Sequence, residues 1–173
     1  MQSRPGVMLQ VFGQGVLLQG DSGVGKSDIA LELVDRGHCL IADDAVEFVI
    51  ENDRLLGRCR AGFEGFLEVH GLGIVCLSRL YDERSVLEQA PLKLVLLLEN
   101  TSADNYDRLQ PVQQPWQLLG VAVPAWTIPC SGRRNLALIV ETAVRLNLCR
   151  QQGYDASIDL QSRLSSLLKE GAA

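Results

Sequence analysis

The eight residues from Gly20 to Ser27 constrain the fold of this chain more than any other segment. They read Gly-Asp-Ser-Gly-Val-Gly-Lys-Ser and match the phosphate-loop pattern G-x-x-x-x-G-K-[ST] at every fixed position. Backbone N–H groups of such a loop converge on a nucleotide phosphate, and its glycines permit positive φ and close approach. Lys26 would neutralise the β- and γ-phosphate oxygens, and the Ser27 hydroxyl would ligate Mg²⁺. The residues expected to bind the nucleotide are Gly20, Asp21, Ser22, Gly23, Val24, Gly25, Lys26 and Ser27.

The segments on either side of the loop support this interpretation. Val16-Leu17-Leu18 is an apolar stretch typical of a strand, and the residues after the loop have the spacing of an amphipathic helix. The apolar positions of that helix are Ile29, Ala30, Leu33 and Val34, and Gly37 closes it. This order places the positive end of a helix under the phosphates. A fortuitous glycine-rich turn is the alternative, and the flanking strand and helix argue against it.

The rest of the pattern predicts an α/β fold with a mixed sheet, with helices near the start and at the C-terminus. A hairpin through Gly13-Gln14-Gly15 is expected to join the first two strands, and Thr101–Pro115 to form a polar surface excursion with a short helical turn. The expected strands are Val7–Val11, Val16–Gln19, His38–Ala42, Ala45–Ile50, Arg54–Gly57, Phe66–Val69, Gly73–Leu77, Leu92–Glu99 and Val121–Ile128. Further helices are expected at Asn135–Arg150 and Ala156–Lys169.

Composition restricts the setting in which such a domain could act. The length of 173 residues predicts a single domain, residues 1–173, and the net charge of −5 argues against nonspecific nucleic-acid binding. The longest apolar run, Leu92–Leu98, is interrupted by Lys93, so no membrane span is expected. The N-terminus lacks the apolar segment of a signal peptide. Five dispersed cysteines without a Cys-x-x-Cys pair indicate reduced thiols and a cytoplasmic location.

An acidic pair, Asp43-Asp44, ends the strand that follows the first helix. An aspartate at such a strand end in phosphate-loop enzymes reaches the Mg²⁺ or the attacking group. If the backbone is extended, the two carboxylates point to opposite sides, so one faces the phosphate. One could then act as the base for a hydroxyl nucleophile while the other supports the metal or neighbouring structure. The alternative is an acidic turn in solvent.

Several segments of the sequence, taken in chain order, resemble the catalytic domain of bacterial HPr kinase/phosphorylase. The matching segments are Gly20–Ser27, Ala30–Val34, Arg36–His38, Ala42–Asp44, Leu67–Ile74, Tyr106–Leu109, Arg134–Ala137 and Gly153–Ala156. The resemblance runs from about Gly6 to the end of the chain. It implies a phosphate-loop kinase fold of the HPr kinase and PEP carboxykinase type.

The resemblance also implies the chemistry. The chain would use ATP and Mg²⁺ to phosphorylate a serine of the small phosphocarrier HPr, in the regulation of carbon metabolism. Asp44 would accept the serine proton and return it in the reverse direction, with Asp43 beside it, and Ser27 and Glu68 would ligate Mg²⁺. Lys26 and Arg108 would stabilise the transferred phosphoryl group. The segment implied for phosphorolysis comprises Pro129, Cys130, Ser131, Gly132, Arg133 and Arg134. The C-terminal helix would help to dock HPr, and a hexamer is expected by analogy.

Considered singly, these residues also have plainer explanations. Glu68 alternates with apolar neighbours on a strand, which is typical of a solvated face. Arg108 stands in a polar loop, where a lone arginine is usually a surface residue. Arg133-Arg134 could flank a helix start, although that is a poor place for cations unless an anion is bound.

The sequence departs from the family pattern at several places. Pro5 stands where the family has a histidine near the catalytic aspartate, and proline cannot exchange a side-chain proton. His70 replaces the usual arginine, and Tyr81–Ser85 replaces a glycine-rich loop. Arg133 takes the place of a glycine, which weakens the case for phosphorolysis. The family's separate N-terminal domain is expected to be absent.

Three functions therefore remain open. The first is an HPr-type serine kinase, favoured by the joint retention of the loop, the acidic pair, Glu68 and Arg108. The second is a kinase that acts on a different substrate, which the altered Tyr81–Ser85 segment permits. The third is an ATP-binding regulatory module with weak or no catalysis, which Pro5 favours.

Overall fold

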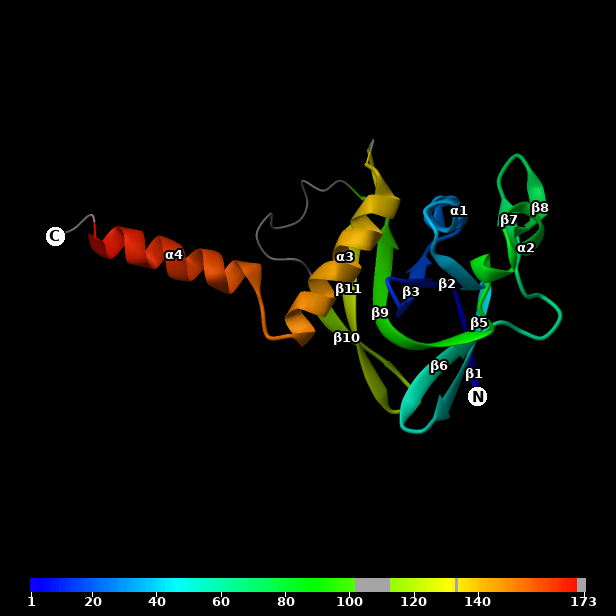
Figure 1. The fold of residues 1–173 in the computed structure, drawn as a ribbon, viewed down its shortest axis with the longest axis horizontal. Helices are drawn as coiled ribbons and strands as arrows, with labels where there is room; N and C mark the ends of the chain where they lie inside the picture. The colour runs from blue at the N-terminus through cyan, green and yellow to red at the C-terminus, as the bar shows by residue number, and fades with distance from the viewer. Residues whose placement is uncertain (102–112, 133, 171–173) are drawn as a thin grey trace.

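The computed structural model describes residues 1–101, 113–132 and 134–170 (Figure 1). The strands are β1 (Gln2–Pro5), β2 (Val7–Val11), β3 (Gln14–Gly20), β4 (Cys39–Ala42), β5 (Ala45–Glu51), β6 (Arg54–Arg58), β7 (Phe66–Val69), β8 (Gly73–Cys76), β9 (Gln89–Glu99), β10 (Gln113–Leu118) and β11 (Val121–Pro129). The helices are α1 (Lys26–Asp35), α2 (Leu77–Leu80), the 3₁₀ turn η1 (Glu83–Ser85), α3 (Leu136–Gln151) and α4 (Ala156–Glu170).

In the described part of the chain, nine strands form one mixed sheet: seven follow the order β1-β5-β6-β9-β3-β2-β4, and β11 and β10 branch from β9. The long strand β9 is its hub: its first residues pair with β6, and its later residues lie parallel to both β3 and β11. β10 extends the sheet beyond β11, and β7 and β8 form a separate antiparallel hairpin. The predicted α/β fold with a mixed sheet is confirmed.

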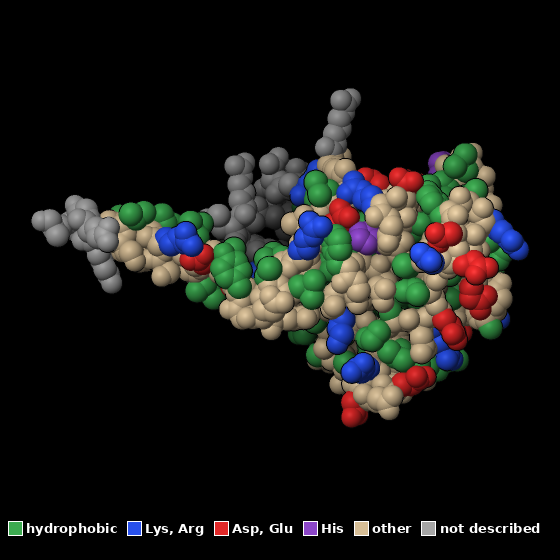
Figure 2. All heavy atoms as spheres, in the orientation of Figure 1, with side chains coloured by type: hydrophobic (Ala, Val, Ile, Leu, Met, Phe, Trp, Pro, Cys, Tyr) green, Lys and Arg blue, Asp and Glu red, His purple; other side chains and the backbone are tan. Residues whose placement is uncertain are grey.

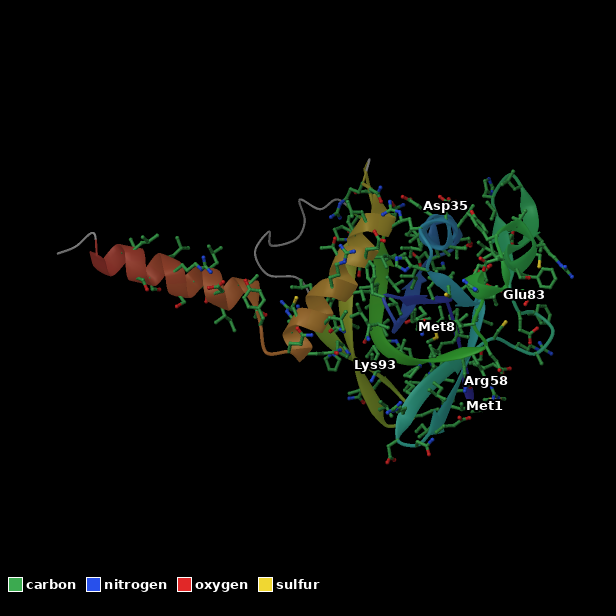
Figure 3. All side chains as sticks on the ribbon, viewed as in Figure 1. Met1, Met8, Asp35, Arg58, Glu83 and Lys93 are labelled. Carbon is green, nitrogen blue, oxygen red and sulfur yellow. The ribbon has the colours of Figure 1, made fainter. Side chains whose placement is uncertain are left out.

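The two faces of the central strands bury different clusters. Along β2 and β3, alternate residues such as Leu9 and Leu18 face α1 and α3, whereas Met8 and Leu17 face the opposite side. On that opposite side the sheet curls over itself, so that Phe48 of β5 packs into the same cluster as Met8. Figure 3 shows Met8 among the densely packed side chains of this interior. Burial on both faces explains why these strands are apolar nearly throughout.

The predicted first helix is confirmed, including its end. All four of its predicted apolar residues are buried in α1. Gly37 has φ +92° and follows the last turn, where its N–H donates to the carbonyl of Val34 and the N–H of His38 donates to that of Leu33. This Schellman arrangement requires a left-handed residue, which glycine adopts without strain. It directs the chain into β4.

Three details differ from the sequence-based predictions, and the first is that Gln2–Pro5 forms strand β1, where no strand was expected. The β2–β3 turn is formed by Phe12 and Gly13, both with positive φ, rather than by Gly13-Gln14-Gly15. Such a two-residue turn matches the twist of a hairpin. Most of the predicted surface excursion (residues 102–112) lies outside the described residues, but Gln113–Pro115 belongs to strand β10 and not to a loop.

Helix α4 extends away from the sheet and its helices (Figure 1). It is amphipathic, as predicted, and its apolar side chains are exposed along its length (Figure 2). These are Ile158, Leu160, Leu164, Leu167 and Leu168. Among the described residues, no helix is both long and apolar enough to cross a membrane.

Candidate active site

Strands β3, β4, β9 and β11 bring their carboxyl ends to one edge of the sheet. β3 runs parallel to β9, with Gly20 opposite Leu98, and β9 runs parallel to β11, with Glu99 opposite Pro129. β4 is antiparallel to β2, which is itself antiparallel to β3, so Ala42 ends at the same edge. Ligands of open α/β sheets bind at this kind of edge.

The phosphate loop leaves β3 at this edge and leads into α1. A Cβ on Gly20 would lie 2.5 Å from the carbonyl oxygen of Leu98, so only glycine fits where β3 passes β9. Gly23 and Gly25 have φ +81° and +94°, as the predicted loop requires. The Lys26 ammonium group donates to the carbonyls of Gly20 and Asp21 at 2.8 and 2.9 Å. The N-terminus of α1 therefore faces the space that the loop encloses.

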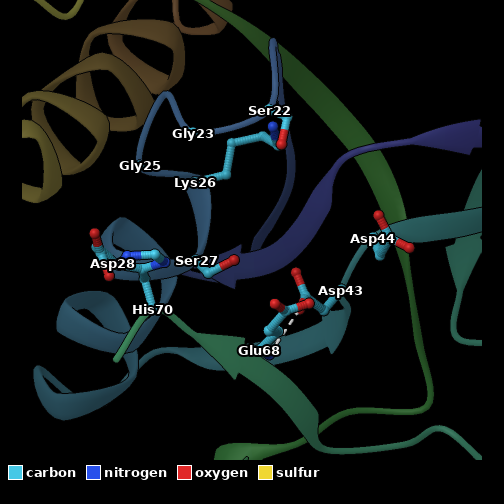
Figure 4. A pocket seen from close by; sticks show the side chains of 10 residues that line it. All are labelled: Ser22, Gly23, Gly25, Lys26, Ser27, Asp28, Asp43, Asp44, Glu68 and His70. Atoms are coloured by element: carbon cyan, nitrogen blue, oxygen red, sulfur yellow. Dashed lines mark hydrogen bonds between the residues drawn. The ribbon is translucent and has the colours of Figure 1, made fainter. Parts of the chain in front are cut away.

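A pocket of about 450 Å³ lies against this loop (Figure 4). Its lining combines the loop and the start of α1 with the ends of β4 and β7. The lining residues are Ser22, Gly23, Gly25, Lys26, Ser27, Asp28, Asp43, Asp44, Glu68 and His70. The structure thus brings together, in one pocket, Lys26, Ser27, both aspartates and Glu68, which had been singled out from the sequence.

Asp43 is the half-buried member of the acidic pair. Its Oδ2 accepts a hydrogen bond from the backbone N–H of Glu68 at 3.1 Å, which ties the end of β4 to β7. Burial raises the pKa of Asp43, and hydrogen bonds from the N–H groups of Glu68 and Asp44 partly offset this rise. In Figure 4 the carboxylates of Asp43 and Glu68 lie together on the side of the pocket where Ser27 stands.

Asp44 is exposed and has φ +64°, so the expectation of extended backbone at the acidic pair is wrong. The N–H of Ala45 donates to the carbonyl of Asp43 at 2.7 Å, which closes a γ-turn with Asp44 at its centre. A γ-turn whose central residue has positive φ is rare and strained. The carbonyl of Asp44 accepts a hydrogen bond from Gly6 at 3.0 Å. The pair therefore diverges because of this turn and not because of strand alternation.

The residues of this pocket fit a magnesium-bound nucleotide. No group of three His, Cys, Asp or Glu side chains in the described ranges is arranged to hold a metal by itself. Mg²⁺ does not need such a cage, because it is commonly bound by one or two carboxylates together with substrate phosphates and water. Ser27, Asp43 and Glu68 supply suitable oxygen ligands beside the phosphate loop.

Two pocket residues, Asp28 and His70, were not predicted to contribute to the site. Asp28 lies in the first turn of α1, and its acidic type is explained equally well by the helix dipole. His70 had been noted only as a departure from the family pattern. It follows β7 directly, so its position two residues after Glu68 was the available signal.

The segment implied for phosphorolysis lies at the same edge but does not line this pocket. The N–H of Cys130 donates to the carbonyl of Glu99, and the Ser131 hydroxyl donates to that of Thr101 at 2.6 Å. Nη1 of Arg134 donates to the carbonyl of Pro129, also at 2.6 Å. Two strand spacings, about 10 Å, separate β11 from β3. Arg108 and Arg133 lie outside the described residues.

Known proteins of similar sequence and structure point to one family. Residues 1–164 match the family described as the HPr Serine kinase C-terminal domain. The HPr kinase/phosphorylase of Streptococcus mutans is 38% identical over 170 residues, which are 97% of this chain and 55% of the relative. That of Burkholderia cenocepacia is 41% identical over 159 residues, 91% of this chain and 49% of the relative. The chain thus spans about half the length of these curated relatives.

A solved structure agrees with this result. The structure of the Hpr(Ser) kinase/phosphatase from Coxiella burnetii matches with a TM-score of 0.83 at 32% identity, and the match covers 92% of this chain and 98% of that one.

Proposed function

Because this chain belongs to the HPr Serine kinase C-terminal domain family, we propose that it transfers the γ-phosphoryl group of ATP to a serine hydroxyl of an HPr-like protein. The observation that carries the proposal is the shared pocket of the phosphate loop, the acidic pair and Glu68. These parts come from β3, β4 and β7, and phosphoryl transfer needs all of them within reach of one phosphate.

The loop residues Gly20–Ser27 bind the phosphates through their N–H groups. Lys26 exchanges its two loop carbonyls for phosphate oxygens and neutralises charge on the transferred group. Ser27 and Glu68 would hold Mg²⁺, and Asp43 would support them from the end of β4. When bound, Mg²⁺ would supply neutralisation of the charge on the phosphate oxygens.

Asp44 is the proton acceptor. It is exposed at the rim of the pocket, where the hydroxyl of a protein substrate can reach it, whereas Asp43 is half-buried and bonded to Glu68. In the reverse direction, with phosphate as acceptor, Asp44 would return the proton to the serine oxygen. Arg108 and the segment Pro129–Arg134 are assigned to the stabilisation of the phosphoryl group and to phosphorolysis, as the family implies.

The substrate and setting follow from the relatives' names. The relatives are named HPr kinase/phosphorylase, so we assign a small phosphocarrier of that type as the partner, and control of carbon metabolism in the cytoplasm as the setting. A homo-oligomer, a hexamer by analogy, is part of the proposal.

Pro5 favours a second candidate, an ATP-binding regulatory module with weak or no catalysis. Pro5 pairs with Ala45, next to Asp44, and its ring provides no group that could exchange a proton there. A third candidate is a kinase of a different substrate. It is favoured by the polar segment Tyr81–Ser85, which comprises η1 and the two residues before it.

One experiment separates the three. The chain is incubated with γ-labelled ATP and Mg²⁺, in one reaction with purified native HPr and in a parallel reaction with an HPr variant whose target serine is replaced by alanine. Label on native HPr and none on the alanine form supports the serine kinase. Hydrolysis or label elsewhere in a cell extract, without HPr labelling, supports a different substrate. Binding of ATP without turnover under any condition contradicts both kinase proposals.

A further inference from the structure

A single peptide group connects the side chain of Gln19 to the backbone of Asp44. Its carbonyl, that of Pro5, accepts a hydrogen bond from Nε2 of Gln19 at 2.9 Å. Its N–H, that of Gly6, donates to the carbonyl of Asp44 at 3.0 Å. A peptide group is planar, so fixing its carbonyl also fixes the direction of its N–H.

Gln19 is itself held in place. Nε1 of Trp116 donates to Oε1 of Gln19 at 2.9 Å, and the indole packs against buried Phe48, with ring centroids 5.9 Å apart. An indole N–H can only donate and a carbonyl can only accept, so these two partners determine which way the amide faces. Glutamine satisfies both, whereas glutamate could accept from Trp116 but could not donate to Pro5.

The contact between Gln19 and this peptide is close. A Cβ on Gly6 would lie 2.5 Å from the carbonyl oxygen of Leu18 and 3.4 Å from Cγ of Gln19, and Gly6 has φ +143°. The side chain of Gln19 therefore lies close to Gly6 as well as to the carbonyl of Pro5. Because Gln19 precedes Gly20 in β3, the residue that holds this peptide is also the neighbour of the phosphate loop.

Asp44 depends on such support. Its positive φ is sparsely populated, and such conformations persist only when surrounding contacts enforce them. We propose that Gln19, held by Trp116, is a positioning residue that orients the Pro5–Gly6 peptide and thereby fixes Asp44 at the rim of the pocket. The catalytic part of this inference rests on the proposed function, whereas the positioning of the turn does not. A peptide whose carbonyl is hydrogen-bonded is also a stronger donor at its N–H.

The test uses the full chain labelled with ¹⁵N and three variants. Gln19→Glu keeps an acceptor for Trp116 but removes the donor to Pro5, and Trp116→Phe removes the other bond. Gln117→Glu, at an exposed site on β10, is the control for the change of charge. Hydrogen exchange of the Gly6 amide reports on the bond to Asp44 without reference to activity. Steady-state assays with ATP and HPr give kcat and KM, and unfolding midpoints exclude variants that do not fold.

In Gln19→Glu we expect the Gly6 amide to exchange about tenfold faster and kcat to fall about tenfold, with KM for ATP within about twofold of the native value. Trp116→Phe should change both quantities in the same direction but less, and Gln117→Glu should change neither. Native protection of Gly6 in Gln19→Glu would overturn the inference. If the native chain transfers no phosphate while Gly6 still loses protection in Gln19→Glu, the proposed function fails but the positioning role stands.

Discussion

Lys26 stabilises the phosphate loop through hydrogen bonds within the protein itself. Its ammonium group bridges the carbonyls of Gly20 and Asp21, the first two residues of the loop. Under the proposed function the same charge would stabilise the transferred phosphoryl group, so Lys26 would have a structural and a catalytic role. The two roles can be separated, because a neutral side chain of similar length still fills the space.

Lys26→Met should lower the rate of phosphoryl transfer by about 100-fold or more, because one preorganised charge at the reacting group is lost. The unfolding midpoint should change little, since the bonds that are lost are exposed. The rate is measured in single-turnover reactions, and ATP affinity by calorimetry. Lys93→Met, on an exposed position of β9, is the control. A transfer rate within about threefold of the native rate would contradict the role of Lys26.

Pro5→His should raise the rate of phosphotransfer. Pro5 pairs with Ala45, so an imidazole at this position would lie near Asp44 and could share its proton. A positioned acid–base group contributes about 100-fold or more to such reactions, and we expect a gain of at least about tenfold. Pro5→Gln is the matched control, because it also restores the backbone N–H but adds no titratable group. Equal rates in the two variants, or no gain in either, would count against this interpretation of Pro5.

Single residues differ in how far the sequence could predict them. The placement of Lys26 and Ser27 in the pocket was predictable, because it follows from a local pattern in which the loop supplies its own geometry. The conformation of Asp44 was not, because its γ-turn is held by Gly6, in the bend between β1 and β2, which is distant in the sequence. Gln19 gave no signal in the sequence, since its two hydrogen-bond partners come from β10 and from the end of β1.

At the level of elements, the sequence-based predictions missed two strands, β1 and β10, of which β10 is the longer. It contains Pro115 and three glutamines, and proline argues against a central strand. Within the described residues β10 pairs only with β11, so Pro115 lies in an edge strand, where proline is tolerated. Edge position is a property of the assembled sheet, which explains why local residue preferences assigned this segment to a loop.

Deletion of residues 156–170 should leave the body of the protein intact. The apolar residues of α4 are exposed, so we expect the free energy of unfolding to change by less than about 0.5 kcal/mol. ATP affinity should be unchanged, while transfer to HPr should fall several-fold if α4 docks the protein substrate. Leu164→Ser with Leu167→Ser should reproduce this loss, and Gln161→Ser on the same helix should not. Full transfer by the deletion variant would remove α4 from the docking surface.

At the scale of the whole molecule, the directions of the strands bring segments that are far apart in the sequence to one edge of the sheet. The phosphate loop, the acidic pair and the Pro129–Arg134 segment follow β3, β4 and β11, whose carboxyl ends share one edge. Each strand was predictable from its apolar residues. Their order was not, because the parallel pairing of β9 with both β3 and β11 depends on contacts between segments far apart in the sequence.

An ionic cluster connects helix α3 to the segment between α1 and β4. It also predicts that the stability of the fold depends on pH. Glu141 of α3 accepts from Arg36 at 2.7 Å and lies 2.9 Å from Nε2 of His38, so it joins α3 to the segment between α1 and β4. Burial alone would raise the pKa of Glu141, but the hydrogen bonds from His38 and Arg36 outweigh it and lower the pKa. The folded state therefore favours the charged carboxylate.

Glu141→Gln should lower the free energy of unfolding by about 1 kcal/mol at pH 7, because it removes the charge from this cluster. A carboxyl whose pKa is lowered on folding adds stability above its unfolded pKa, about 4.3, and loses it as the pH falls through the lower folded value. Denaturant unfolding between pH 3 and pH 7 should thus show the native and variant curves converging at the acidic end. Glu32→Gln, which removes a more exposed partner of Arg36, is the control and should cost less. A difference between native and Glu141→Gln that is independent of pH would show that packing, and not the charge of Glu141, holds α3 to the sheet.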